Sequence, residues 1–262
     1  MPTINQNLEK WGKNYNWPQA GDEWSKSWGG ATRQWHGSVL PRIERFLPAP
    51  TILEIAPGFG RWTQFLKQYC DCLIGVDLNT NCIEACRRRF ADSAQLRFYR
   101  NDGKSLEMVP NNSIDFIFSF DSLVHAEADV IGAYLAQFNR ILRPEGVGFI
   151  HHSNYGAHTV SSAVMAMGRV SGLRRLLWRF RLGGIQPNYH SRAETMSAVR
   201  FRSLCAQHGI RCIEQEIVNW GASFLNDCFS TVVRGDSITW PQQTRIIENL
   251  RFMEEAARIK ST

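Results

Sequence analysis

Short apolar runs alternate with amphipathic segments through the middle of the chain. The apolar runs predict buried strands at 51–56, 72–78, 96–102, 113–121 and 147–153. The amphipathic segments predict helices over 33–46, 61–70, 79–91 and 127–142. Because strands and helices alternate across short connections, the pattern predicts an α/β fold with a doubly wound parallel sheet that is covered on both faces.

The alternation changes after the fifth predicted strand. Residues 155–190 are longer than a plain connection, and we expect them to form a helical lid inserted after that strand. A helix is expected over 191–208, followed by strands over 210–220 and 224–235. The short turn between these two strands predicts an antiparallel hairpin, which brings the sheet to seven strands.

The length and composition fit a single globular domain. The chain has 262 residues, of which 44% are hydrophobic and 21% are charged, and it shows no internal repeat. A last amphipathic helix is expected over about 241–259. We divide the one domain, 1–262, into an N-terminal helical cap (1–48), a core (51–154), the lid (155–190), the end of the core sheet (191–235) and a C-terminal helix (236–262).

Charge and cysteine content narrow the class of protein. The net charge of +6 is mildly basic, and the 24 acidic residues interspersed along the chain argue against a dedicated nucleic-acid binder. No secretory signal or membrane-spanning run is recognisable, and seven cysteines fit a reducing compartment, so we expect a cytoplasmic protein. The cysteine pairs at 70/72 and 82/86 have no histidine nearby, and we predict no metal site there.

The first candidate chemistry lies after the first predicted strand. In a doubly wound sheet the ligand binds beyond the carboxyl ends of the strands. Gly58 and Gly60 allow the backbone there to approach a ligand closely. Thr63 takes the place of the third glycine of a dinucleotide fingerprint, and the acid Glu54 precedes the turn, so the site suits a positively charged group better than a pyrophosphate.

Acidic residues also stand at the ends of the next three predicted strands. Asp77 at the second strand can accept hydrogen bonds from both hydroxyls of a ribose, a role that NAD enzymes share. Asp102, beside Gly103 after the third strand, could receive an adenine amino group. Phe120 and Asp121 end the fourth strand beside the expected pocket.

Taken in order, the motifs ILEIAPGFG, IGVDL, RNDG and SIDFIFSFD resemble those of the class I S-adenosylmethionine-dependent methyltransferases, over residues from about 51 to 154. The resemblance implies a Rossmann-like sheet of seven strands that ends in the antiparallel hairpin. It also implies S-adenosylmethionine as the cofactor. The sequence departs from the family pattern at Ala56, where glycine is usual, and at Pro57.

The resemblance also assigns roles to the residues at the strand ends. It implies that Glu54 and the turn over 56–60 hold the amino-acid end of the cofactor, that Asp77 takes the ribose, and that Asp102 with Gly103 takes the adenine. The cofactor-binding residues expected on this basis are Glu54, Ala56, Pro57, Gly58, Gly60, Asp77, Leu78, Asp102, Gly103 and Phe120.

The acceptor of the methyl group is predicted from the histidines. An alcohol acceptor needs a general base near the sulfonium. His125 is the expected base, Asp121 is expected to orient it or to contact the substrate, and His152 is the third expected catalytic residue. Because side chains alternate along a strand, only one of His151 and His152 should point toward the pocket. The strand-five end carries histidines where metal-dependent relatives carry acids, so no metal is predicted.

Signatures of other acceptors are missing. No NPPY-type tetrapeptide and no cysteine follow the fourth strand, which favours an O-methyltransferase. The segments QWHGSVLPRIERFLP, APGFGRW, FDSLVH and FIHHSN resemble bacterial methyltransferases that modify sugars and cell-surface glycans. We therefore expect a carbohydrate, glycan precursor or similar small molecule as the acceptor. An RNA methyltransferase and a non-catalytic S-adenosylmethionine-binding protein are the alternatives.

Two further segments suggest partners. The lid carries five arginines and no acid between 169 and 181, which fits peripheral contact with an anionic membrane, binding of a phosphorylated substrate, or a solvated face. Five tryptophans fall in the first 35 residues, and they could stack on sugar rings, cover the cofactor or dock the cap. The sequence does not indicate an oligomeric state.

Overall fold

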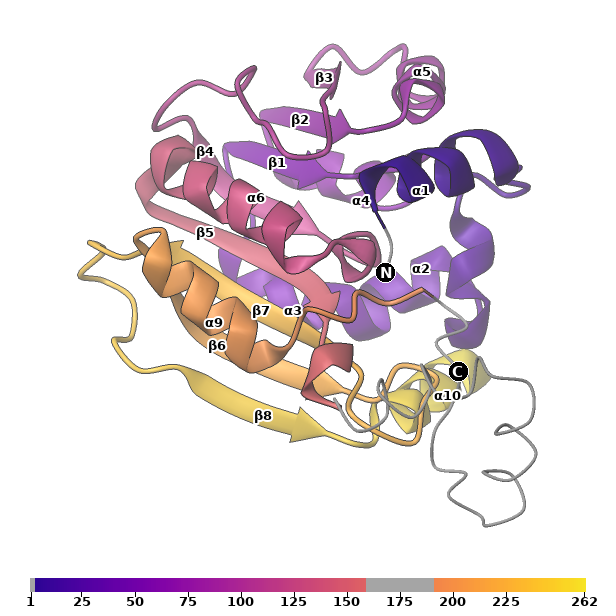
Figure 1. The fold of residues 1–262 in the computed structure, drawn as a ribbon. Helices are drawn as coiled ribbons and strands as arrows, with labels where there is room; N and C mark the ends of the chain where they lie inside the picture. Colours follow the sequence, from indigo (N-terminus) through magenta and orange to yellow (C-terminus); the bar gives the residue numbers. More distant parts are fainter. Residues whose placement is uncertain (1–2, 159–190) are drawn as a thin grey trace.

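The N-terminal part of the chain is a series of short helices that lie beside the sheet (Figure 1). The computed structural model describes residues 3–158 and 191–262. The elements before the sheet are α1 (Ile4–Glu9), η1 (Lys10–Asn14), η2 (Asp22–Trp28), α2 (Ala31–Gln34), η3 (Trp35–Val39), α3 (Leu40–Ile43) and η4 (Glu44–Phe46). The helix predicted over 33–46 is therefore confirmed as a run of consecutive helical segments.

One mixed sheet forms the centre of the molecule. Its strands are β1 (Thr51–Ile55), β2 (Cys72–Asp77), β3 (Leu96–Arg100), β4 (Ile114–Ser119), β5 (Leu142–Ser153), β6 (Ile210–Val218), β7 (Asp227–Arg234) and β8 (Arg245–Asn249), in the order β3-β2-β1-β4-β5-β7-β6-β8. The first five strands pair in parallel, and β7 is antiparallel to both of its neighbours. The predicted doubly wound core and the terminal hairpin are confirmed.

The eighth strand is a correction to the predicted seven. β8 pairs in parallel with β6 at the edge of the sheet, and the C-terminal helix α10 (Phe252–Ser261) begins well after residue 241. Ile246, Ile247 and Leu250 fit a helical stripe as well as a strand, so their spacing does not decide between the two. Side chains of an edge strand are only partly buried, and Ile246 is 50% exposed. The sequence of β8 therefore lacks the run of buried apolar residues that predicts a strand inside a sheet.

Helices cover both faces of the sheet. The helices after β1 are α4 (Thr63–Leu66), η5 (Lys67–Tyr69), α5 (Thr80–Arg89), η6 (Leu123–His125), α6 (Ala128–Ile141), η7 (Tyr155–Ala157) and α9 (Ala198–Gln207). Buried side chains of α6 and α9 form one core cluster with the sheet, and those of η3, α3, α4 and α10 form another on the opposite side (Figure 1). The helix expected over 191–208 begins later, at Ala198, where Ser197 caps it by accepting a hydrogen bond from the Arg200 amide.

The predicted lid falls largely outside the described residues. Of 155–190 the structure describes only the first four residues, with η7, and the arginines at 169–181 lie outside it. Within 3–158 and 191–262, no helix combines the length and the apolar character that a bilayer crossing requires. The seven cysteines are free thiols.

Candidate active site

A pocket of about 120 Å³ opens at the carboxyl ends of β1, β2 and β4. The sheet side contributes Ala56, Gly58, Asp77, Leu78 and Gly103, all of which the sequence assigned to the cofactor. The opposite wall comes from the N-terminal segment, through Ile4, Asn7, Trp11, Trp17 and Trp24. The site is therefore enclosed between the sheet edge and the cap.

Asp77 is one of the two buried acids that line this pocket, with Asp121 as the other. Its Oδ2 accepts a hydrogen bond from the Gly58 amide at 3.1 Å, and its Oδ1 accepts one from the Asn79 amide at 2.8 Å. Burial raises the pKa of Asp77 to about 6, although these amides oppose the shift. The carboxylate lines the pocket, and a carboxylate oxygen is the kind of acceptor that the hydroxyls of a diol such as ribose require.

The turn after β1 has the backbone shape that a close approach requires. Ala56 and Gly58 both adopt left-handed conformations, with φ of 57° and 59°. A Cβ atom at Gly58 would lie 2.8 Å from the Trp17 ring. Glycine at this position therefore allows the cap to pack against the turn. Trp17 also stacks on Phe59, with the ring centres 4.7 Å apart.

Several predicted cofactor residues lie just outside this pocket. Pro57 and Phe120 line an adjoining cavity of about 40 Å³, which they share with Arg61. Gly60 faces Phe90, and a Cβ atom there would lie 2.5 Å from that ring. Asp102 is exposed, and its Oδ1 accepts hydrogen bonds from the backbone amides of Lys104 and Ser105.

Glu54 lies beneath the turn rather than in the pocket. It is 1% exposed, and its Oε2 accepts a hydrogen bond from the Thr63 hydroxyl at 2.6 Å. Burial is the main cause that raises the pKa of Glu54 to about 7, and the nearby Asp77 carboxylate raises it further. The structure thus places Glu54 where it supports the turn from below.

The raised pKa of Glu54 predicts a pH-dependent stability. The unfolded chain releases this proton near pH 4.5, and the folded chain holds it until about pH 7, so stability is lost as the pH rises between these values. A shift of that size corresponds to about 3 kcal/mol at most. We expect Glu54→Gln, which needs no ionisation, to unfold at higher urea concentration than the wild type at about pH 8 and to lose less stability between about pH 5 and 8.

The exposed Glu107→Gln serves as the matched control for that measurement, because it removes a carboxylate without touching the turn. Equal stability changes in the two variants would contradict the burial argument for Glu54.

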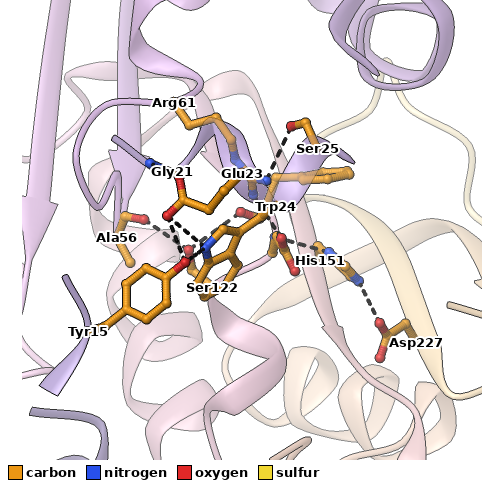
Figure 2. A network of polar contacts seen from close by, with 12 residues as sticks. Tyr15, Gly21, Glu23, Trp24, Ser25, Ala56, Arg61, Ser122, His151 and Asp227 are labelled. Atoms are coloured by element: carbon orange, nitrogen blue, oxygen red, sulfur yellow. Dashed lines mark hydrogen bonds and ion pairs between the residues drawn. The ribbon is translucent and has the colours of Figure 1, made fainter. Parts of the chain in front are cut away.

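Asp121 and Arg61 form a buried ion pair at the mouth of the site. Arg61 Nη2 lies 2.8 Å from Asp121 Oδ2, and both side chains are almost fully buried. The guanidinium also lies 4.5 Å from the centre of the Trp62 ring. It donates a hydrogen bond to the Ser25 hydroxyl (Figure 2). Asp121 lines both cavities and has a left-handed backbone with φ of 61°.

His125, the expected base, lies in the wall of the pocket. Its Nδ1 is 3.0 Å from the Ser191 carbonyl oxygen, and because a carbonyl only accepts, the proton sits on Nδ1. Nε2 is buried and has no hydrogen-bond partner among the described residues. Burial lowers the pKa of His125 to about 4, and the charge of Arg192 lowers it further. The ring is therefore neutral near pH 7 and carries its lone pair on Nε2.

The two histidines of β5 point to opposite faces of the sheet, as predicted. His152 stacks on Phe201 of α9 at 4.1 Å, and its Nε2 lies 2.8 Å from the Ser230 hydroxyl, so the structure does not bring this expected catalytic residue to the pocket. His151 lies on the opposite face and contacts Asp121.

A chain of polar contacts runs from His151 back toward His125. His151 Nδ1 accepts the Asp121 amide at 3.0 Å, and its Nε2 lies 3.3 Å from Asp227 Oδ2 (Figure 2). Asp227 Oδ2 lies 2.6 Å from Arg192 Nη2. Arg192 directly follows Ser191, whose carbonyl oxygen accepts the hydrogen bond from His125. Sequence reasoning missed Asp227 and Arg192, because neither belongs to a motif and both join the site only through the fold.

An aromatic cluster forms the cap side of the pocket. Trp11, Tyr15, Trp17 and Trp24 contact one another, with ring centres between 4.9 and 6.0 Å apart. The Tyr15 hydroxyl donates to Glu23 at 2.7 Å and accepts from the Trp24 indole (Figure 2). The tryptophan-rich start of the sequence was the signal for this cluster.

The residues present fit an adenosyl cofactor. A buried carboxylate at the end of β2, small residues at Gly58 and Gly103, and an apolar wall between them suit a ribose and a flat base. Among residues 3–158 and 191–262, no group of three or more histidine, cysteine, aspartate or glutamate side chains is arranged to hold a metal ion.

Comparison with known proteins identifies the central part of the chain. Residues 52–146 match the family model of a methyltransferase domain. A 63-residue stretch is 35% identical to the ribosomal RNA small subunit methyltransferase A of Methylococcus capsulatus, and this match spans 23% of the chain and 24% of that relative.

Solved structures show the same fold at low sequence identity. The PH0226 protein of Pyrococcus horikoshii OT3 superposes with a TM-score of 0.54 at 17% identity, over 78% of this chain and 91% of that one. An S-adenosylmethionine-dependent methyltransferase of Clostridium acetobutylicum gives 0.55 at 13% identity, over 78% and 92%. The magnesium protoporphyrin IX methyltransferase of Synechocystis PCC 6803, solved with bound SAH, gives 0.53 at 13% identity, over 84% and 88%.

The expected enzyme class and cofactor are thereby confirmed. The pocket lies at the carboxyl ends of the parallel strands, inside the region that the family model covers. The chain carries a methyltransferase domain on the class I fold, and S-adenosylmethionine is the cofactor of this methyltransferase.

Proposed function

We propose that this methyltransferase transfers the methyl group to a hydroxyl of a carbohydrate, a glycan precursor or a similar small molecule. One observation carries the proposal: in the wall of the pocket, His125 presents an unprotonated Nε2 that has no hydrogen-bond partner among residues 3–158 and 191–262. A buried acceptor atom without a partner is costly, and a substrate hydroxyl supplies the missing donor.

The residues of the chain fit the needs of this reaction. Bound S-adenosylmethionine supplies an electrophilic methyl group on a sulfonium. Asp77, Gly58 and Gly103 would hold its adenosine part, and the cap would exclude water from the site. His125 Nε2 orients the acceptor hydroxyl and takes its proton, while the Ser191 carbonyl holds the ring in the productive tautomer.

The covering of the pocket favours a small acceptor over a folded RNA. The N-terminal helices close one side of the site with aromatic side chains rather than with a basic groove. The match to a ribosomal RNA methyltransferase covers under a quarter of the chain, and it lends the RNA alternative little weight.

The test is methyl transfer from radiolabelled S-adenosylmethionine to a panel of acceptors. The panel contains free sugars, sugar phosphates, nucleotide sugars, a lipid-linked glycan precursor and total ribosomal RNA. We expect label on a hydroxylated small molecule and none on RNA. Label on RNA alone, with a steep loss at raised salt, would replace the proposal by the RNA alternative.

The lowered pKa of His125 predicts an unusual pH profile. A free imidazole would lose its basic form below about pH 6.5, but the buried ring stays neutral until its pKa of about 4. At saturating cofactor and acceptor, we expect kcat to stay level between about pH 5 and 7 and to fall toward pH 4. Circular dichroism at each pH checks that the protein remains folded. A fall in kcat centred near pH 6.5 would contradict the assignment.

A further inference from the structure

A lysine without a counter-ion lies beside the proposed base. Lys10 begins η1, and its Nζ donates to the Ser191 hydroxyl at 3.0 Å. The ammonium also lies 4.6 Å from the centre of the Trp11 ring. Within residues 3–158 and 191–262, no carboxylate forms an ion pair with Lys10, and its contacts are a neutral hydroxyl and an indole face.

The remainder of the chain offers no carboxylate side chain either. The sequence of residues 159–190 contains neither aspartate nor glutamate, and neither do residues 1–2. Whatever position these residues take, their side chains do not supply an acidic partner. The positive charge of Lys10 is therefore left for a group outside the chain.

The other charges of this corner of the site are already paired. Asp227 binds Arg192 through two carboxylate oxygens, and Asp121 binds Arg61. Burial lowers the pKa of Lys10, and the neighbouring charge of Arg192 lowers it further, as expected where positive charge is in excess. An anion beside Lys10 would relieve this excess.

Lys10 and His125 contact the same two residues, Ser191 and Trp11. Ser191 links them, since its hydroxyl accepts from Lys10 and its carbonyl accepts from His125, each at 3.0 Å. The Trp11 ring, which lines the pocket, lies 5.2 Å from the His125 ring. The Lys10 ammonium and the His125 ring therefore lie at the same corner of the site, joined by Ser191 and Trp11.

We infer that Lys10 anchors an oxyanion of the acceptor, a phosphate or a carboxylate. The inference rests on the proposed function, which supplies the hydroxyl, and it narrows the acceptor from any hydroxylated small molecule to an anionic one such as a sugar phosphate or a uronate. Lys10 Nζ supplies the charge and donates the hydrogen bonds, and Trp11 forms the floor beside it.

The experiment measures binding of three probes to the protein loaded with S-adenosylhomocysteine: glucose 1-phosphate, glucuronate and glucose. Titration calorimetry is run on the wild type and on Lys10→Ala, Lys10→Arg and Lys13→Ala. Lys13 is the matched control, because it is an exposed lysine of the same short helix.

We expect at least one anionic probe to bind the wild type about tenfold or more tightly than glucose, as one charge-assisted contact allows. Lys10→Ala should reduce that affinity to the level of glucose, Lys10→Arg should retain most of it, and Lys13→Ala should leave it unchanged. Tighter binding of glucose 1-phosphate points to a phosphate, and tighter binding of glucuronate points to a carboxylate.

Equal affinity for charged and neutral probes, or equal losses in Lys10→Ala and Lys13→Ala, would overturn the inference. The proposed function fails separately. If the anionic probes bind in a Lys10-dependent way but the protein methylates no hydroxyl, the anion site stands and the proposed O-methyltransferase activity is wrong. If the protein methylates neutral sugars equally well in the wild type and in Lys10→Ala, the proposed O-methyltransferase activity stands and the anion site is wrong.

Discussion

Replacing Asp77 by alanine is expected to abolish measurable binding of S-adenosylmethionine and S-adenosylhomocysteine. The buried carboxylate at the end of β2 is the acceptor that we expect for the two ribose hydroxyls, and a hydrogen bond to a charged group contributes about 1.5–3 kcal/mol. Loss of both bonds corresponds to a decrease in affinity of at least about 100-fold. Titration calorimetry with the two adenosyl compounds measures the effect directly.

Asp77 also accepts the Gly58 and Asn79 amides, so a second variant separates cofactor contacts from local folding. Asp77→Asn keeps one side-chain oxygen and should lose less affinity than Asp77→Ala. Asp92→Ala, at an exposed position after α5, should bind as the wild type does. Retention of S-adenosylhomocysteine binding by a folded Asp77→Ala protein would show that the ribose site has been misplaced.

Replacing His125 is expected to remove turnover and to spare cofactor binding. General-base catalysis typically contributes a factor of about 10²–10⁴, and kcat of His125→Ala should fall by that amount. The affinity for S-adenosylhomocysteine should stay within about twofold of the wild type, because no expected cofactor contact is lost. Single-turnover methyl transfer and titration calorimetry measure the two quantities on the same preparation.

Two further variants make the result for His125 specific. His125→Gln keeps a polar side chain in the buried wall and should restore stability without restoring kcat. His36→Ala removes an exposed histidine of the cap helices and should leave both kcat and affinity unchanged. Full activity in His125→Ala would end the assignment of this residue as the base.

Much of the fold follows from local pattern. Four of the five parallel strands lie inside the sheet and were recognisable because a strand covered on both faces is a continuous apolar run, as at Thr51–Ile55 and Ile114–Ser119. β8 was not, because an edge strand with an exposed Ile246 lacks both a buried run and a clear alternation. The pattern therefore failed at one of the two edge strands and succeeded at the other, β3.

Some of the predicted site residues line the pocket, and others face away from it. Asp77 and Gly103 follow directly from their positions at strand ends, which the topology brings to one edge. Glu54 and His152 have the right position along the strand but face away from the pocket, toward Thr63 and Phe201 respectively. The direction in which a strand side chain points depends on which face each helix covers, and short motifs do not encode that.

Contacts between residues that are far apart in the chain could not be predicted from the sequence. Lys10 and Ser191 are 181 positions apart, yet their side chains form a hydrogen bond. The tryptophan-rich start predicted an aromatic surface but not its place over Gly58. Only the packing of the cap against the sheet shows that Lys10 and the proposed base His125 both contact Ser191.

The central claim is methyl transfer to oxygen, and the most direct measurement is the chemical position of the methyl group in the product. The enzyme is supplied with S-adenosylmethionine labelled with ¹³C at the methyl carbon, together with the acceptor that takes up label from the panel. The carbon resonance of the product distinguishes a methyl ether or ester from a methyl on nitrogen, sulfur or carbon. We predict a methyl bonded to oxygen that is absent when His125→Ala replaces the wild type; a methyl on nitrogen, sulfur or carbon would contradict the proposal.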